Sequence, residues 1–452
     1  MGPSLGVAKP ISARPNILFI LADDLGYADV SCYGRPDYQT PNVDRIASQG
    51  MRFMQAYANS AVCSATRTAL ITGRYQDRLD VGLDEPNGVR DVGLPPDHPT
   101  LPSLLKKVGY STALIGKWHL GSLPKFGPLQ SGYDHFVGIR SGGQDYFKYD
   151  SDYWIDDTLA HETGYLTDRL GDHAVSMIET LAAQPNPFFI SLHFTSPHWP
   201  WEGPNDQAES DRLAKNPSGL FVFDGGTQET YAQMVMALDT QIGRALDALE
   251  RAGLASNTIV IFTSDNGGER FSDTWPFNGK KGELLEGGIR VPTIVYWPGR
   301  VAPNTVSNQV IMSMDWLPTL LAAAGTRPDR HYPSDGMNFI KTLEGKTTPK
   351  PRKLFWRYNA LHQEAVRDGD LKYLKILDNT FLFNVVDDPL ERANLKDRLP
   401  DVFNRLATDW QAWNKTMLPY TDKNYSWTGS GKELADHFGS PGGVDPRPTD
   451  TK

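Results

Sequence analysis

The chain is organised around residues 61–75, which read AVCSATRTALITGRY. A short polar run that contains Cys63 leads into an apolar, helix-compatible segment, and Gly73 is suited to end that helix. Cys63 is therefore predicted to lie at or just before a helix N-terminus, where backbone N–H groups and the helix dipole favour an anion or a strong nucleophile. Arg67 follows one helical turn later and can reach back over Cys63. Taken alone, the segment also fits a buried cysteine followed by a surface arginine.

The composition indicates a globular enzyme. A chain of 452 residues can bury a large core, and one large domain with a smaller one is expected. The net charge of −9, without a basic stripe, argues against nucleic acid as a partner. The two cysteines, Cys32 and Cys63, leave no intrachain disulfide if Cys63 is catalytic. The sequence contains no run of the length and hydropathy that a membrane span requires.

Two apolar runs of strand length end in oxygen-bearing side chains. Residues 16–22 precede Asp23 and Asp24, and residues 258–263 lead to Asp265 and Asn266. We expect buried parallel strands whose carboxyl ends meet at one edge of a sheet, where open α/β sheets bind ligands. Three carboxylates and one amide suit a hard cation such as Ca²⁺ or Mg²⁺. Asp23 and Asp24 alone would fit a polar turn that caps a helix equally well.

Two further predicted strands deliver basic side chains. Residues 111–115 lead to Lys117 and His119 in the run GKWHLG, and residues 187–194 lead to His198, which lies between prolines in SPHWPW. Residues 142–165 are rich in Tyr, Asp and Trp without clear periodicity, which predicts a long loop. Asp145, Tyr146 and Tyr149 of this loop are candidates for substrate contact, although they also fit an ordinary packed loop.

Five motifs in this order resemble those of the sulfatase family, counting NGKKGELLEGGIRVP at residues 278–292. In that family the cysteine of the Cys-x-Ala-x-Arg pattern is oxidised to Cα-formylglycine, and the aldehyde hydrate is the nucleophile. Ala65 and Thr66 stand where many members have proline and serine, which leaves open which maturation enzyme would recognise the site.

The resemblance implies an α/β fold of the alkaline-phosphatase type, with a mainly parallel central sheet, helices on both faces and a small C-terminal α+β subdomain. The expected division is an N-terminal extension at 1–15, a catalytic domain at 16–349, a subdomain with a small antiparallel sheet at 350–417 and a tail at 418–452. Within the subdomain, residues 364–373 and 382–392 are predicted to be hairpin strands, and residues 395–417 a helix.

The resemblance also assigns roles within the site. It implies calcium, rather than magnesium, held by Asp23, Asp24, Asp265, Asn266 and formylglycine 63. Arg67 and Lys117 would hold the hydrate, His119 would deprotonate it, and His198 and Lys281 would serve the leaving alcohol and bind substrate. Lys280 is a neighbouring lysine that could compete for the role of Lys281.

The expected activity is hydrolysis of a carbohydrate or aryl sulfate monoester. The alternatives are a phosphonate monoester or phosphodiester hydrolase of the same superfamily, and a non-catalytic protein that binds sulfated glycans. A formylglycine-generating maturation enzyme is an expected partner. The start of the sequence lacks a hydrophobic signal region, which indicates either a cytoplasmic protein or an exported one whose leader is absent from this sequence.

Overall fold

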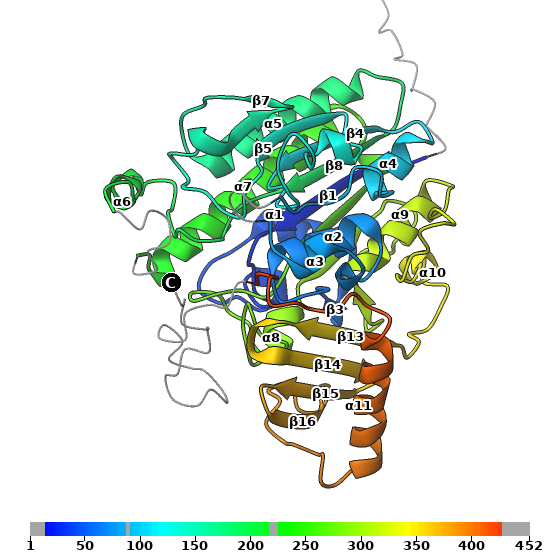
Figure 1. Ribbon diagram of the computed structural model, residues 1–452. Helices are drawn as coiled ribbons and strands as arrows, with labels where there is room; N and C mark the ends of the chain where they lie inside the picture. Colours follow the sequence, from blue (N-terminus) through cyan, green and yellow to red (C-terminus); the bar gives the residue numbers. More distant parts are fainter. Residues whose placement is uncertain (1–13, 87–90, 217–224, 427–452) are drawn as a thin grey trace, which may run out of the picture.

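The computed structural model describes residues 14–86, 91–216 and 225–426. The predictions for residues 1–13 and 427–452 lie outside the described residues. The described part is built on a ten-stranded sheet in the order β11-β2-β10-β9-β1-β8-β4-β5-β6-β7 (Figure 1). Five adjacent strands at its centre are parallel. They are β9 (Thr258–Ser264), β1 (Asn16–Ala22), β8 (Phe188–His193), β4 (Ser111–Gly116) and β5 (His135–Ile139).

The outer strands make the sheet mixed. On one side β10 (Thr293–Tyr296) runs antiparallel to β9 and to β2 (Met51–Phe53), which pairs in parallel with β11 (Thr305–Ser307). On the other side β6 (Tyr153–Ile155) and β7 (Thr158–Leu159) form a short hairpin against β5. The prediction of one unbroken loop at residues 142–165 was therefore wrong, because this hairpin extends the sheet edge.

Helices cover both faces of the sheet, and the strand sequence explains why. In β1, Leu18 and Ile20 belong to one apolar core while Ile17 and Phe19 belong to another, and all four are buried. A strand buried on both faces reads as a continuous apolar run. The first core is completed by α1 (Pro41–Gln49), α5 (Leu166–Ala182) and α7 (Gln228–Arg251). The second contains residues of α2 (Cys63–Thr72), α3 (Asp80–Leu83), α4 (Leu101–Lys106), α9 (Trp316–Ala323) and α10 (Ile340–Leu343).

A second sheet follows, which confirms the prediction of a C-terminal subdomain with a small antiparallel sheet. Four antiparallel strands pack with α11 (Pro400–Asn414) at the lower end of the view in Figure 1. They are β13 (Lys353–Tyr358), β14 (Gln363–Asp368), β15 (Leu371–Ile376) and β16 (Asn379–Asn384). A two-stranded pairing of β3 (Ala56–Tyr57) with β12 (Ile311–Met312) lies outside both sheets.

The element boundaries in this subdomain differ from the prediction. Residues 364–373 form two strands joined by a turn at Gly369, whose φ is +62°. A glycine adopts that left-handed conformation without steric cost, so the Asp-Gly pair marks a hairpin turn. The strand expected at 382–392 ends at Asn384, and the helix expected at 395–417 starts at Pro400. Of the predicted tail, Leu418–Ser426 lies against the rest of the molecule, where Leu418 N–H donates to the Asp77 carbonyl at 3.0 Å.

A buried ionic cluster joins the segment around residue 286 to the second sheet. Lys372 of β15 is fully buried, and its Nζ lies 3.0 Å from Glu286 Oε1 and 2.9 Å from Glu391 Oε1. Glu286 opens α8 (Glu286–Ile289) and also pairs with Arg290 at 3.1 Å. Because a buried charge without its partner is strongly destabilising, this cluster ties the segment around residue 286 to the C-terminal sheet.

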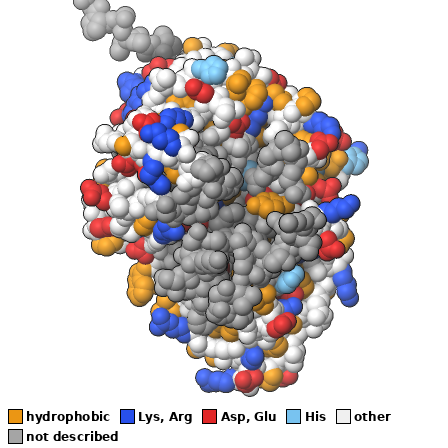
Figure 2. Space-filling model, turned by 60° about the vertical axis from the view of Figure 1, so that its left-hand side comes forward, with side chains coloured by type: hydrophobic (Ala, Val, Ile, Leu, Met, Phe, Trp, Pro, Cys, Tyr) orange, Lys and Arg blue, Asp and Glu red, His pale blue; other side chains and the backbone are white. Residues whose placement is uncertain are grey.

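On the face drawn in Figure 2, basic and acidic side chains are interspersed over the described part of the surface. Within residues 14–86, 91–216 and 225–426, helices with both the length and the apolar character needed to cross a membrane are absent.

Candidate active site

The ends of four central strands deliver the predicted side chains to one place. Asp23 and Asp24 follow β1, Asp265 and Asn266 follow β9, and all four are buried. The Asp24 backbone N–H donates to Asp265 Oδ1 at 3.2 Å, which joins the two strand ends directly. The predicted meeting of these two strand ends at the sheet edge is therefore confirmed in geometry.

Lys117 reaches this place because β4 ends in a glycine. Gly116 has a φ of +113°, and a Cβ there would lie 1.7 Å from the carbonyl oxygen of His193 at the end of β8. Only glycine permits so close an approach of the two backbones. The Lys117 N–H then donates to that same carbonyl at 2.8 Å, and the side chain turns inward with no exposed surface.

Cys63 is the first residue of α2, as the sequence predicts, and Gly73 ends that helix in the left-handed conformation. The cysteine is 4% exposed, and its Sγ lies within 4.8 Å of ligand atoms of Asp23, Asp24 and His198. Burial raises the pKa of its thiol well above the ordinary value. As an unmodified cysteine, residue 63 is therefore a poor nucleophile near neutral pH.

Three carboxylates and three basic side chains face one another in the site. The three ion pairs are Asp23 with Lys117 at 2.7 Å, Asp24 with Lys281 at 2.6 Å and Asp265 with Arg67 at 2.8 Å. Burial opposes every one of these charges, yet Arg67 and Lys117 hold the pKa of Asp265 below its usual value. For Asp23, by contrast, burial outweighs the attraction of Lys117 and raises the pKa to about 8.

The site fits a hard cation. Asp23 Oδ1 and Asn266 Oδ1 are both buried and accept no hydrogen bond from any described residue. Orphaned buried oxygens are costly, and a cation satisfies them. Asp23, Asp24, Cys63 and His198 form a cluster that could hold a metal ion. A divalent cation added to the balanced ion pairs would leave the site positive, which suits an anionic substrate.

Two histidines complete the cluster. His198 Nδ1 lies 2.5 Å from the Trp199 carbonyl, which can only accept, so Nδ1 carries a proton and Nε2 faces Asp24 Oδ2 at 3.5 Å. His119 is 4% exposed, and its backbone N–H donates to the Arg140 carbonyl at 3.1 Å. Burial, together with the nearby Lys117, holds the pKa of each histidine well below its ordinary value. Both are therefore neutral bases near pH 7.

The structure separates the two adjacent lysines. Lys281 Nζ contacts Asp24, and its backbone N–H donates to the Gly268 carbonyl at 3.0 Å. Although burial opposes the charge, Asp24 holds the pKa of Lys281 well above its usual value. Lys280 is only half-buried, and its N–H donates to Glu283. The geometry therefore favours Lys281 over Lys280 as the site residue.

The three loop candidates lie in the interior. Tyr146 is fully buried, and its hydroxyl lies 2.9 Å from the carbonyl oxygens of Thr195 and His198. Asp145 is 4% exposed and accepts from Ser210 and two backbone N–H groups, and Tyr149 is also fully buried. The contacts of Tyr146 therefore support the turn that carries His198.

Two further groups near the site were not predicted. His193, the last residue of β8, lies 3.4 Å from Arg67, and the strand-end argument that found Lys117 applies equally to it. Glu269 follows Asn266 by three residues, and its buried Oε2 accepts no hydrogen bond from the described residues. Burial, opposed mainly by Lys281, raises its pKa to about 7. No sequence signal distinguished it from a surface glutamate.

Comparison with known protein families gives a match over most of the chain. Residues 15–326 match the sequence profile of the family described as Sulfatase, and this range is more than half of the chain. The chain belongs to the sulfatase family. Residues 278–410 of this sulfatase also match the profile described as N-sulphoglucosamine sulphohydrolase, C-terminal. The resemblance seen in the motifs is thus confirmed over both sheets.

Arylsulfatase J of Mus musculus is 30% identical to this sulfatase over 480 residues, covering 92% of this chain and 78% of the mouse protein. N-acetylgalactosamine-6-sulfatase of Homo sapiens is 33% identical over 384 residues, covering 78% of this chain and 69% of the human protein. The crystal structure of Ps i-CgsB in complex with k-i-k-neocarrahexaose matches with a TM-score of 0.82 at 28% identity, covering 93% of this chain and 97% of that chain.

The sulfatase is accordingly a sulfuric ester hydrolase. Its fold is the expected one, a mainly parallel central sheet between helices with a small antiparallel sheet after it. The alternative of a non-catalytic protein that binds sulfated glycans does not fit this assignment.

Proposed function

We propose that this sulfatase removes sulfate from a sulfated carbohydrate, with a formylglycine hydrate at position 63 as the nucleophile. The observation that carries the proposal is the convergence of Cys63, three carboxylates and three basic side chains in one buried site. The preference for a carbohydrate rests on two similar proteins, Ps i-CgsB in complex with k-i-k-neocarrahexaose and the human N-acetylgalactosamine-6-sulfatase.

In this proposal the buried position of Cys63 at the start of α2 serves the hydrate. The helix N-terminus stabilises negative charge on the attacking oxygen. Arg67 and Lys117 hold and polarise the hydrate, because both are cations fixed by carboxylates. His119, held neutral by burial, accepts the proton of the second hydroxyl, so that sulfate leaves and the aldehyde is restored.

The oxygens of Asp23, Asp24, Asp265 and Asn266 would hold the cation. Such hard ligands suit Ca²⁺ or Mg²⁺, and Ca²⁺ is proposed because the resemblance to the sulfatase family implies it. When bound, a divalent cation supplies charge stabilisation for the sulfate oxygens in the transition state. The maturation enzyme that converts Cys63 to formylglycine would be the partner this chemistry requires.

On the leaving-group side, Lys281, which Asp24 keeps charged, transfers a proton to the departing alcohol oxygen as the bond between that oxygen and sulfur breaks. His198 presents Nε2 to the same space, because its Nδ1 is occupied by the Trp199 carbonyl. Tyr146 supports the backbone of His198, because its hydroxyl lies 2.9 Å from the His198 carbonyl oxygen. Asp145 accepts hydrogen bonds from the backbone N–H groups of Phe147 and Lys148, and so fixes the chain next to Tyr146.

Substrate comparison tests the proposed activity. We expect kcat/KM for 4-nitrophenyl sulfate to exceed that for the matched aryl phosphonate and phosphodiester by at least about 10-fold. All three esters carry a single negative charge, so the expectation rests on the membership of the chain in the sulfatase family and not on charge. Sulfate released from sulfated oligosaccharides, measured by ion chromatography, should then exceed release from the aryl ester. Faster hydrolysis of the phosphonate or the diester would support the rival phosphonate or phosphodiester hydrolase.

The neighbouring lysines offer a matched pair of variants. Lys281→Ala should lower kcat/KM on the order of 10²- to 10³-fold, because it removes a buried charged donor at the reacting ester. Lys280→Ala should stay within about 3-fold of the parent, as expected of a residue outside the reacting centre. Steady-state kinetics on one aryl sulfate decides this. An equal loss in both variants, or a larger loss at Lys280, contradicts the assignment.

A further inference from the structure

The guanidinium of Arg67 is held on several sides. Its Nε donates to Asp265 Oδ2 at 2.9 Å, and its Nη1 donates to the Lys117 carbonyl at 2.9 Å. Nη1 also lies 3.4 Å from Nδ1 of His193. Arg67 is 2% exposed, and its Nη2 also lies 3.6 Å from Asp23 Oδ1, so the orientation of its planar group is set by protein neighbours.

The contact with Arg67 determines the tautomer of His193. An arginine guanidinium can donate hydrogen bonds but cannot accept them. In this contact Nδ1 of His193 is the acceptor, which places the ring proton on Nε2. The Lys117 backbone also interacts with the ring, and its carbonyl is the competing partner that would accept from a protonated Nδ1. Burial, with the positive charge of Arg67, holds the pKa of His193 well below its ordinary value, which agrees with a neutral ring.

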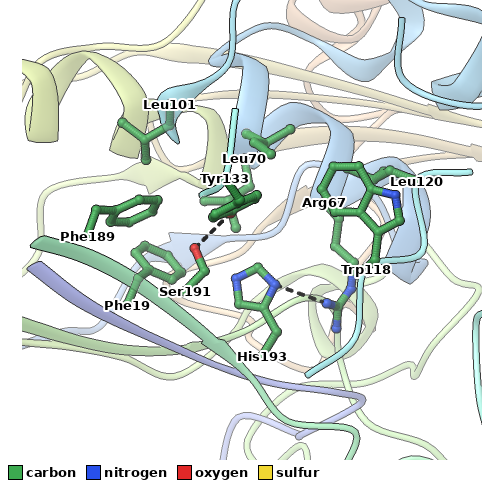
Figure 3. Close-up of a pocket in the computed structure, with 11 residues that line it drawn as sticks. Phe19, Arg67, Leu70, Leu101, Trp118, Leu120, Tyr133, Phe189, Ser191 and His193 are labelled. Carbon is green, nitrogen blue, oxygen red and sulfur yellow. Dashed lines mark hydrogen bonds between the residues drawn. The ribbon is translucent and has the colours of Figure 1, made fainter. Parts of the chain in front are cut away.

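The Nε2–H of His193 then requires a partner. Nε2 is buried and has no hydrogen-bond partner among the described residues. His193 lines a cavity of about 20 Å³, together with Phe19, Tyr133 and Ser191 (Figure 3). In that view the nitrogen that does not face Arg67 lies on the side of Ser191.

The cavity is lined mainly by apolar side chains, but its size and the polar atoms of His193, Ser191 and Tyr133 on its wall suit one water molecule. A buried water needs at least about 10–15 Å³ and two or more polar partners. Ser191 Oγ and Tyr133 Oη lie 2.9 Å apart on the cavity wall. A water there would accept from His193 Nε2–H and donate to one of these two hydroxyl oxygens.

We propose that His193 is a positioning residue of this sulfatase, whose Nδ1 orients Arg67 and whose Nε2–H is satisfied by a single buried water bridging to the Ser191–Tyr133 pair. This inference rests on the proposed function, in which Arg67 polarises the hydrate at position 63. The effect of His193 passes through Arg67, so it belongs to the transition state more than to substrate binding.

Replacing His193 by each of two amide side chains separates the contact made by Nδ1 from the contact made by Nε2. His193→Asn places an acceptor near the position of Nδ1, whereas His193→Gln places its amide near Nε2 and leaves Arg67 without its partner. We expect His193→Gln to lower kcat about 10-fold at unchanged KM, the lower end of the loss seen when a supporting contact to an active-site group is removed. His193→Asn should stay within about 3-fold of the parent on the same basis.

Folding and maturation are controlled in the same samples. Thermal unfolding midpoints and the mass of the peptide that contains residue 63 should be alike in both variants, so that a difference in kcat reports on the Arg67 contact. Equal losses of kcat in the two variants, or an unchanged kcat in His193→Gln, would overturn the positioning role.

The tautomer is measured independently of activity. In ¹⁵N-histidine-labelled protein, the His193 ring signals, assigned by their loss in His193→Asn, should show protonated Nε2 and unprotonated Nδ1. A protonated Nδ1 overturns the contact with Arg67 whatever the kinetics show. If the parent enzyme releases sulfate from no ester while the Nε2–H tautomer is present, then the proposed function fails and the contact stands.

Discussion

Replacement of Cys63 by alanine is expected to abolish sulfate release, with a loss of at least about 10⁴-fold in kcat, because removing a covalent nucleophile leaves only binding and electrostatic effects. The folded structure should persist. The change removes one buried sulfur from the first turn of α2, and the Asp265–Arg67 ion pair nearby does not depend on that atom. Ion chromatography of released sulfate gives the activity, and thermal unfolding gives the stability.

Cys32 provides the matched control. It is the other cysteine of the chain, it is half-buried, and its backbone N–H donates to Asp44 at 2.9 Å, a contact that alanine retains. Cys32→Ala should therefore keep its activity within about twofold, as for a substitution away from the site. If the Cys63→Ala protein released sulfate at the parent rate, the nucleophile would have to be another group.

The second large effect is expected at the cation site. Asp24→Asn keeps the shape of the side chain but removes a charge that faces Lys281 and His198 and that accepts a hydrogen bond from Asn266 Nδ2 at 2.7 Å. We expect kcat/KM to fall on the order of 10²- to 10³-fold, comparable to the loss of one fixed electrostatic contact to the transition state. Metal content by mass spectrometry should fall in the same variant.

The cation site can also be tested in the parent enzyme, without a mutation. Chelation should remove activity, and Ca²⁺ should restore it more fully than Mg²⁺. Saturating Ca²⁺ should also stabilise the folded enzyme, by about 2.7 kcal/mol at a concentration 100 times Kd. Asp247→Asn is the matched control, since that side chain is 55% exposed and pairs only on the surface with Arg45. Full activity in metal-free parent enzyme would refute the cation's role.

The strand ends could be predicted because their signal is local. A strand buried on both faces, such as β1 or β9, appears in the sequence as an unbroken apolar run, and the ligands that follow it mark the sheet edge. The position of Cys63 at a helix start was also predictable from local signals. A polar run precedes the helix-compatible apolar segment, and Gly73 ends it.

Other features depend on residues that are distant in sequence. The pairing of Lys372 with Glu286 and Glu391 joins the C-terminal sheet to the segment around residue 286. No spacing pattern in the sequence predicts this pairing. The β6–β7 hairpin was missed because its strands are two or three residues long. Gly369 is different, because the Asp-Gly pair was visible in the sequence and marks the turn that the structure contains.

The loop candidates show how burial changes an interpretation. From the sequence, Tyr146 is a candidate for substrate contact because it lies in a Tyr- and Asp-rich segment. In the structure its hydroxyl donates toward the backbone carbonyls of Thr195 and His198. A sequence cannot show which side of a loop faces the interior. His193 was overlooked for the opposite reason, because a histidine inside an apolar strand resembles an ordinary core residue.

The mass of the tryptic peptide from Phe53 to Arg67 tests the central claim most directly. The account predicts that active enzyme yields this peptide with formylglycine in place of Cys63, and that the specific activity of different preparations rises in proportion to the modified fraction. A fully active preparation in which that peptide carries only unmodified cysteine would contradict the account.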